Sequence, residues 1–286
     1  MRPSKAGKWG TYQIQPGKSK VFRLEDAIQV MFKRVANEVW IATTDLSKKQ
    51  PDLKPLIPEQ TETPEQPEQG LIEVTDEQIE ASKQKWMRWA LKSGNANLKI
   101  VPAFPNLPVV IQPEYSFRLM RGSSARFYTR IPVFIQVRDM DEGDLLITEI
   151  PSHNLARTWF GTFTDGEICY WFKTTARREL TEDVYRPYLC VCPITIINES
   201  EEELYVDKVS IRGEQLTVFG DGKSLWSDEM TIKYKGGKDF SDLIVTGVPP
   251  QEAPNATLLN KPRNPVNMGL ARRTFRKLHD LHSKIG

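Results

Sequence analysis

The sequence predicts a mainly β protein with two β-sandwich-like parts, an inserted helix and a C-terminal amphipathic helix. Its short apolar runs are rich in β-branched and aromatic residues, which favour strands. Turn signals recur about every 8–12 residues, a spacing typical of sandwiches and barrels. The clearest pair of runs covers residues 190–198 and 204–211, separated by an acidic loop at 199–203. We expect these two runs to be adjacent strands of an antiparallel sandwich.

The N-terminal part begins with a predicted three-stranded meander at residues 21–24, 28–34 and 38–42. Ile28, Val30 and Phe32 share one face of the middle strand, because side chains alternate along a strand. The dipeptide Ala36-Asn37 suits the tight turn into the third strand.

A stretch rich in proline and glutamate at residues 47–70 interrupts the strands and predicts a loop or linker. After it, Thr75 and Gln78 have the spacing of a capping box, which predicts a helix with its body at residues 79–91. Trp86 and Trp89 belong to the apolar side of this expected helix.

Strand patterns return after residue 98. The expected strands lie near residues 98–101, 108–111, 115–120, 131–138, 144–149, 216–219, 225–234 and 243–245. The runs 158–163 and 167–172 predict a hairpin with Asp165-Gly166 at its tip.

The C-terminal segment has the signals of a helix. Asn264 suits the N-cap, Pro265 suits the first helical position, and the helix is expected to run to about residue 284. An apolar stripe at helical spacing consists of Ala271, Phe275, Leu278, Leu281 and Ile285, and the basic residues Arg272, Arg273, Arg276 and Lys277 lie largely off it. The basic tail suits an acidic partner, an anionic membrane surface or RNA. Docking on its own protein is favoured, because the apolar stripe needs burial.

These patterns divide the chain into four parts. They are an N-terminal β part at 1–46 plus 94–125, a Pro/Glu-rich loop with the inserted helix at 47–93, a C-terminal β-sandwich at 126–250, and a linker with the final helix at 251–286.

Composition narrows the class of protein. Among the 286 residues, 39 basic and 37 acidic side chains give a net charge of +2, which gives no strong nucleic-acid signal. The charge is uneven, since residues 52–80 hold nine acids and one base, and residues 261–286 hold seven bases and one acid. Three cysteines make no disulfide framework, and no segment suits a signal peptide or a membrane span. We therefore expect a cytoplasmic protein.

Candidate metal, cofactor and nucleophile sites all have simpler explanations. Cys190 and Cys192 share a strand face and could join Cys169 in a metal site, but buried cysteine usually packs as a small hydrophobe. Residues 220–224 resemble the end of a phosphate-binding loop, yet the required first glycine and following helix are missing, which favours a plain turn. The spacing of His279 and His282 does not suit a metalloprotease. The sequence predicts no catalytic residue, cofactor or metal.

The richest cluster of aromatic and cationic residues consists of Arg157, Trp159, Tyr170, Trp171, Arg177 and Arg178. Alternation places Trp159 and Phe160 on opposite faces of the predicted hairpin, so one face is core and the other could be an exposed binding patch. Core packing of these aromatics is favoured, because large aromatic side chains usually fill cores. The binding-patch alternative stays open.

Three segments resemble the pattern of a prokaryotic family known only as a domain of unknown function, number four-three-two. They are residues 160–168, 175–178 and 192–198, and the resemblance is best over about residues 98–250. The family has no assigned activity, so it implies no catalytic residue. The resemblance implies a cytoplasmic all-β protein, and the position of some members near mechanosensitive channel genes implies a peripheral, membrane-linked regulatory role.

Three functional hypotheses follow. The leading one is a non-enzymatic module that binds a protein partner or regulates one, with a homo-oligomer as one form of it. The first alternative is a sandwich that binds a small molecule or carbohydrate through the aromatic and cationic cluster. The second alternative is a hydrolase whose acidic residues the sequence does not single out.

Overall fold

The computed structural model describes residues 9–47, 70–81, 85–92, 94–164, 166–181, 185–236, 240–264 and 272–273. The chain divides into two compact units: Met1–Ala103 with Val133–His153 form unit 1, and Phe104–Pro132 with Asn154–Gly286 form unit 2. Unit 1 thus contains residues 133–153, which the sequence analysis assigned to the C-terminal sandwich.

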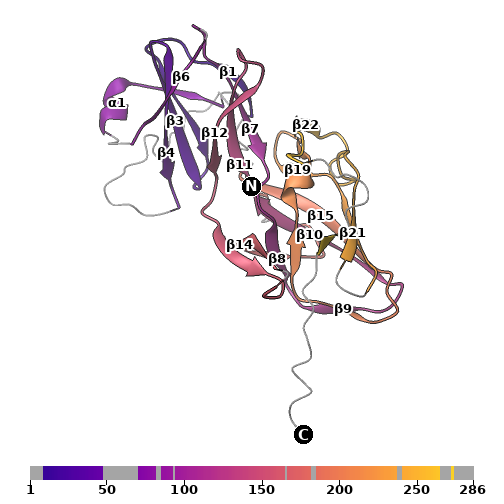
Figure 1. Ribbon diagram of the computed structural model, residues 1–286. Helices are drawn as coiled ribbons and strands as arrows, with labels where there is room; N and C mark the ends of the chain where they lie inside the picture. Colours follow the sequence, from indigo (N-terminus) through magenta and orange to yellow (C-terminus); the bar gives the residue numbers. More distant parts are fainter. Residues whose placement is uncertain are drawn as a thin grey trace. The chain divides into compact units, whose positions relative to one another are not determined.

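Strands make up most of the regular structure in both units (Figure 1). Unit 1 contains β1 (Gly10–Gln13), β2 (Ser19–Leu24), β3 (Ile28–Val35), β4 (Glu38–Asp45), β5 (Ile72–Val74), α1 (Asp76–Ala81), β6 (Met87–Ala90), β7 (Asn97–Ala103), β11 (Phe134–Asp139) and β12 (Leu145–Pro151). Unit 2 contains β8 (Val109–Pro113), β9 (Phe117–Leu119), β10 (Ser124–Pro132), β13 (Ala156–Phe160), β14 (Glu167–Ala176), β15 (Leu189–Asn198), β16 (Leu204–Val206), β17 (Val209–Ile211), the 3-10 turn η2 (Gly213–Gln215), β18 (Val218–Gly220), β19 (Leu225–Ser227), β20 (Met230–Tyr234), β21 (Phe240–Val245), β22 (Thr257–Asn260) and β23 (Arg272–Arg273). The mainly β fold class is confirmed.

Unit 1 is built from two antiparallel sheets in the order β5-β2-β3-β4-β6 and β1-β7-β11-β12. The predicted meander is confirmed as β2, β3 and β4, and Ala36 turns the chain between β3 and β4 with a φ of 48°. Phe22 and Phe32 are fully buried, and the ring of Trp9, next to β1, lies 5.1 Å from the ring of Phe22. These contacts join the two sheets into one core.

The predicted inserted helix is wrong over most of its length. Its capping box is real, because the Gln78 side chain accepts from the Thr75 N–H at 2.9 Å, but helix α1 ends at Ala81. Residues 87–90 instead form β6 along the open edge of β4, where Arg88 lies opposite Trp40. A partner strand far away in sequence outweighs the local helical spacing.

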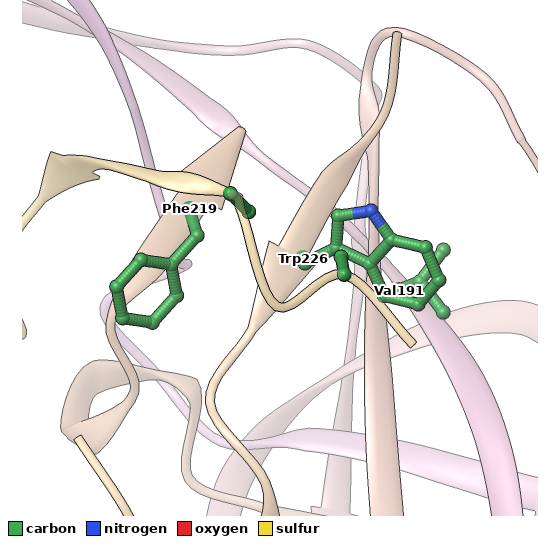
Figure 2. Close-up of a cluster of buried hydrophobic side chains, with 5 residues drawn as sticks. Val191, Phe219 and Trp226 are labelled. Atoms are coloured by element: carbon green, nitrogen blue, oxygen red, sulfur yellow. The ribbon is translucent and has the colours of Figure 1, made fainter. Parts of the chain in front are cut away.

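In unit 2, the described strands form a large sheet in the order β22-β18-β19-β15-β20-β21-β23, with β10 also pairing with β15. A second sheet has the order β13-β14-β8-β17, and β16 pairs with β9. Val191, Phe219 and Trp226 pack with Ala253 and Ala256 on one face of the large sheet (Figure 2). The predicted hairpin is confirmed as β13–β14, and the expected strand at 216–219 pairs with the start of the run at 225–234 as β18 and β19.

The expected pairing of residues 190–198 with 204–211 is wrong. Strand β15 pairs antiparallel with β10 on one side and parallel with β19 and β20 on the other, while β16 and β17 join β9 and β8. The turn after β15 explains the separation. The Asn198 amide donates to the carbonyls of Leu119 at 2.9 Å and Glu202 at 2.7 Å, so the chain leaves the sheet there instead of folding back on it.

Two further expectations need correction. The single strand at 225–234 is two strands, β19 and β20, separated at the buried residue Asp228. The C-terminal helix is not supported, because Arg272 and Arg273 form β23, paired with Ser241 and Phe240 of β21. Arg276, Lys277 and the rest of the predicted helix lie outside the described residues.

Among the described residues, no helix has the length and apolar character needed to cross a bilayer.

Candidate functional site

A cavity of about 780 Å³ in unit 2 is the candidate site (strands β8, β9, β10 and β14 in Figure 1). Its apolar lining consists of Pro113, Phe117, Leu119, Ala125, Phe127 and Ala176. Its other lining residues are Glu114, Tyr115, Arg118, Arg177, Arg178, Glu179 and Thr181. Small-molecule sites have volumes of roughly 300–1,000 Å³ and combine an apolar lining with a few polar groups.

The strand ends around the cavity are held by backbone hydrogen bonds. The Glu114 N–H donates to the Ala176 carbonyl at 3.0 Å, which ties the end of β8 to the end of β14. One residue further on, Arg177 exchanges two backbone hydrogen bonds with Tyr128 of β10, at 2.7 and 2.9 Å. The Arg177-Arg178 pair therefore leaves β14 from a position fixed against two other strands.

The floor of the cavity is apolar and packed. The rings of Phe117 and Phe127 lie 6.2 Å apart in an edge-to-face arrangement, which is a favoured geometry for aromatic pairs. Leu119, Ala125 and Ala176 are buried beside them. The floor can therefore take an apolar group without leaving a polar atom unsatisfied.

The cationic side chains differ in their surroundings. Arg118 forms an ion pair with Glu203, and its guanidinium lies 5.3 Å from the centre of the Tyr205 ring. Arg177 donates to the Thr181 hydroxyl at 3.3 Å. Arg178 is exposed at the rim. The lining contains three arginines and two glutamates, Glu114 and Glu179. The net charge of its side chains is therefore slightly positive.

Comparison with known proteins gives one match. The model of a family described as "Protein of unknown function (DUF432)" matches residues 8–279. The chain belongs to this family. The match extends on both sides of residues 98–250, where the resemblance is best, and the description assigns no activity. No curated protein and no solved structure matches the chain.

The structure separates the cluster of aromatic and cationic residues that the sequence singled out. Arg177 and Arg178 line the cavity, whereas Arg157, Trp159 and Tyr170 share one face of the β13–β14 hairpin. Trp159 is 54% exposed, its indole N–H donates to the Thr162 carbonyl at 3.0 Å, and the Tyr170 hydroxyl donates to Asn106 at 3.1 Å. A binding role for the hairpin residues stays a prediction.

Trp171 lies on the opposite face of the hairpin and is half-buried. It packs against Val110, Phe160 and Cys169, and the Lys208 ammonium lies 5.6 Å from its ring centre. The favoured core-packing interpretation therefore suits Trp171 and Phe160 but not Trp159, which points away from this core.

The cavity residues that the sequence analysis missed come mainly from β9 and β10. Phe117, Arg118 and Leu119 form a short strand in a proline-rich stretch. Its only sequence signal is the alternation of apolar side chains with one cation. Phe127 belongs to an ordinary strand pattern. No local signal brings either segment next to Arg177.

The cysteines behave as core residues. Cys169, Cys190 and Cys192 are free and buried, and burial raises the pKa of the Cys169 thiol to about 11. Burial, then contact with Cys192, also raises the pKa of Cys190. In the part of the chain that the structure describes, no three His, Cys, Asp or Glu side chains gather as metal ligands.

Proposed function

We propose that unit 2 is a ligand-binding module whose cavity takes a small organic anion with an apolar body. The observation that carries the proposal is the position of Arg177 and Arg178 beside the apolar floor of a cavity of about 780 Å³. This is the small-molecule alternative from the sequence, with the site moved from the hairpin to the cavity.

The charges support an anion of limited size. Arginine stays protonated at all physiological pH values and fits carboxylate, sulfonate or phosphate oxygens with two parallel N–H groups. Arg177 and Arg178 are adjacent in the lining and Arg178 is exposed at the rim, so these two are the cations proposed to contact the ligand. Glu114 and Glu179 in the same lining disfavour a long polyanion such as a nucleic acid.

The apolar floor supports a ligand with an aromatic or aliphatic body. Phe117 and Phe127 present ring edges and faces at the floor, while Tyr115 is largely exposed at the rim. Burial of apolar ligand surface contributes about 25 cal/mol per Å², so a body of a few rings adds several kcal/mol before the cost of association. The anionic group then sets the orientation.

Two fluorescent probes with one scaffold test the proposal. The anion 1-anilinonaphthalene-8-sulfonate and the uncharged N-phenyl-1-naphthylamine differ by the sulfonate group. We expect saturable binding of the anion to the full-length protein, with tighter binding than that of the uncharged probe. Arg178→Glu should weaken anion binding at least about tenfold, since charge-assisted hydrogen bonds contribute about 1.5–3 kcal/mol. The same substitution should leave the uncharged probe unaffected.

Arg121→Glu is the matched control, because Arg121 is another exposed arginine of unit 2 and lies outside the cavity lining. Phe117→Ala should weaken both probes by removing part of the floor. Equal affinity for the two probes, combined with no response to Arg178→Glu, would sink the proposal.

A further inference from the structure

Strand β13 is an open edge of its sheet. The sheet has the order β13-β14-β8-β17, and in the described part of the chain β14 alone pairs with β13. An unpaired strand edge presents backbone N–H and C=O groups that can pair with another strand. Ala156 and Arg157 at its start are exposed.

The face beside this edge is apolar and exposed. Trp159 and its cross-strand neighbour Ile168 are 54% and 52% exposed, and Phe163 at the hairpin tip is 96% exposed. Large apolar side chains that gather on one surface mark an interaction site. The Trp159 ring is also held in place, because its indole N–H donates to the Thr162 carbonyl and a Cβ at Gly166 would collide with the ring.

The sequence of β13 is complementary to itself. In an antiparallel pair of two β13 strands with a two-fold axis at Thr158, Arg157 of each copy lies directly opposite Trp159 of the other. Both residues point to the exposed face, since they are two apart on one strand. A register centred on Arg157 would place two guanidinium groups opposite each other, which is destabilising.

Unit 1 contains the same cross-strand contact. Trp40 of β4 lies directly opposite Arg88 of β6, and the Arg88 guanidinium is 4.6 Å from the centre of the Trp40 ring. Tryptophan is the best aromatic partner in cation–π pairs, and arginine is the more frequent cation. A directly opposed Arg–Trp pair is therefore compatible with the sheet geometry that this chain adopts.

We propose that two copies of this chain associate through antiparallel pairing of β13, with the two-fold axis at Thr158. Pairing joins the β13-β14-β8-β17 sheets of the two copies into one continuous sheet. On the exposed face, pairing places Trp159 of each copy beside Arg157 of the other. The self-complementary register argues for a second copy of the chain over an unrelated partner, because a two-fold interface needs one patch that matches itself.

Sedimentation velocity over a range of concentrations tests the association, and charge substitutions test the register. An acidic variant carries Arg157→Glu with Trp159→Glu, and a basic variant carries Trp159→Lys. Each variant alone places like charges opposite each other, so we expect at least about a tenfold loss of self-association. A one-to-one mixture places Glu opposite Lys and Glu opposite Arg157, so the mixture should recover the dimer.

Val248→Glu is the matched control, since Val248 is another exposed apolar side chain of unit 2, at 57% exposure, outside the hairpin. Circular dichroism establishes that each variant is folded. A monomeric wild-type protein at all concentrations overturns the proposal. A dimer that survives the acidic substitutions overturns the choice of surface. A mixture that stays monomeric overturns the register.

Discussion

Asp228 should make the stability of unit 2 depend on pH in an unusual direction. This residue lies between β19 and β20, is 1% exposed, and accepts the Thr217 backbone N–H at 3.1 Å. Burial raises its pKa from the ordinary 3.8 to about 6, despite hydrogen bonds that favour the charged form. Between these two pH values the folded protein holds a proton that the unfolded chain has released.

The difference between the folded and unfolded pKa of Asp228 sets the direction and the size of the change in stability with pH. Because the folded state binds more protons, the free energy of unfolding falls as the pH rises from about 4 to about 6. A pKa difference of about two units corresponds to about 3 kcal/mol, since each unit is worth about 1.4 kcal/mol. The carboxylate therefore destabilises the fold at neutral pH, and this cost disappears in mild acid.

Urea unfolding of the wild type and of Asp228→Asn, measured from pH 3.5 to 7.5, isolates the effect. Asparagine cannot ionise, and all other titrating groups cancel in the difference between the two proteins. The wild type should lose about 3 kcal/mol relative to the variant over this range. The difference in free energy of unfolding between the wild type and Asp228→Ala should change with pH in the same way, although its absolute value will differ. A difference that is flat with pH would refute the reasoning.

Three further predictions concern single sites. Ala36 has a φ of 48°, a region that glycine adopts more easily, so Ala36→Gly should raise the free energy of unfolding by about 1 kcal/mol in urea titrations. Cys169, Cys190 and Cys192 are buried, so a thiol-specific disulfide reagent should label fewer than one of them in the time that labels all of them in urea; rapid labelling of the native protein contradicts this burial. The Glu252 carboxylate accepts the Tyr128 hydroxyl at 2.5 Å and an Arg126 N–H at 2.9 Å; although burial raises its pKa, these hydrogen bonds lower it overall. Glu252→Gln should therefore cost about 1–3 kcal/mol at pH 7, and this cost should shrink as the pH falls below the ordinary glutamate pKa; an equal cost at pH 3 and pH 7 would contradict the ion-pair explanation.

The sequence predicted the elements that depend on neighbours in the chain. The β3–β4, β13–β14 and β18–β19 hairpins each combine two apolar runs with a short turn, so their pairing needs no distant information. The capping box at Thr75 is local for the same reason. The body of the predicted helix failed because β4 offers residues 87–90 a sheet edge, and a helical spacing of apolar residues does not reveal that edge.

The cavity could not be predicted because its walls meet through distant pairings. Its segments at 113–119, 125–127 and 176–181 come together through the parallel β8–β14 pair and the Tyr128–Arg177 bridge. The pair Arg177-Arg178 was visible in the sequence as a cation cluster beside aromatic residues. Its neighbours across the cavity, Phe117 and Phe127, were not, since nothing local relates them to residue 177.

Strand β15 explains how the fold supports the cavity. Its run from Leu189 to Ile194 is buried at every position, whereas a strand with one solvent-exposed face alternates between apolar and polar residues. Such a continuous run is typical of a strand covered on both faces. Strand β15 is also central in its sheet, with β10 on one side and β19 and β20 on the other. Ile194 and Ile196 lie directly opposite Phe127 and Ala125, which form part of the cavity floor. This largely buried strand therefore holds the floor of the proposed ligand site in place, and substitutions that loosen β15 should weaken ligand binding although no residue of β15 is in the cavity lining.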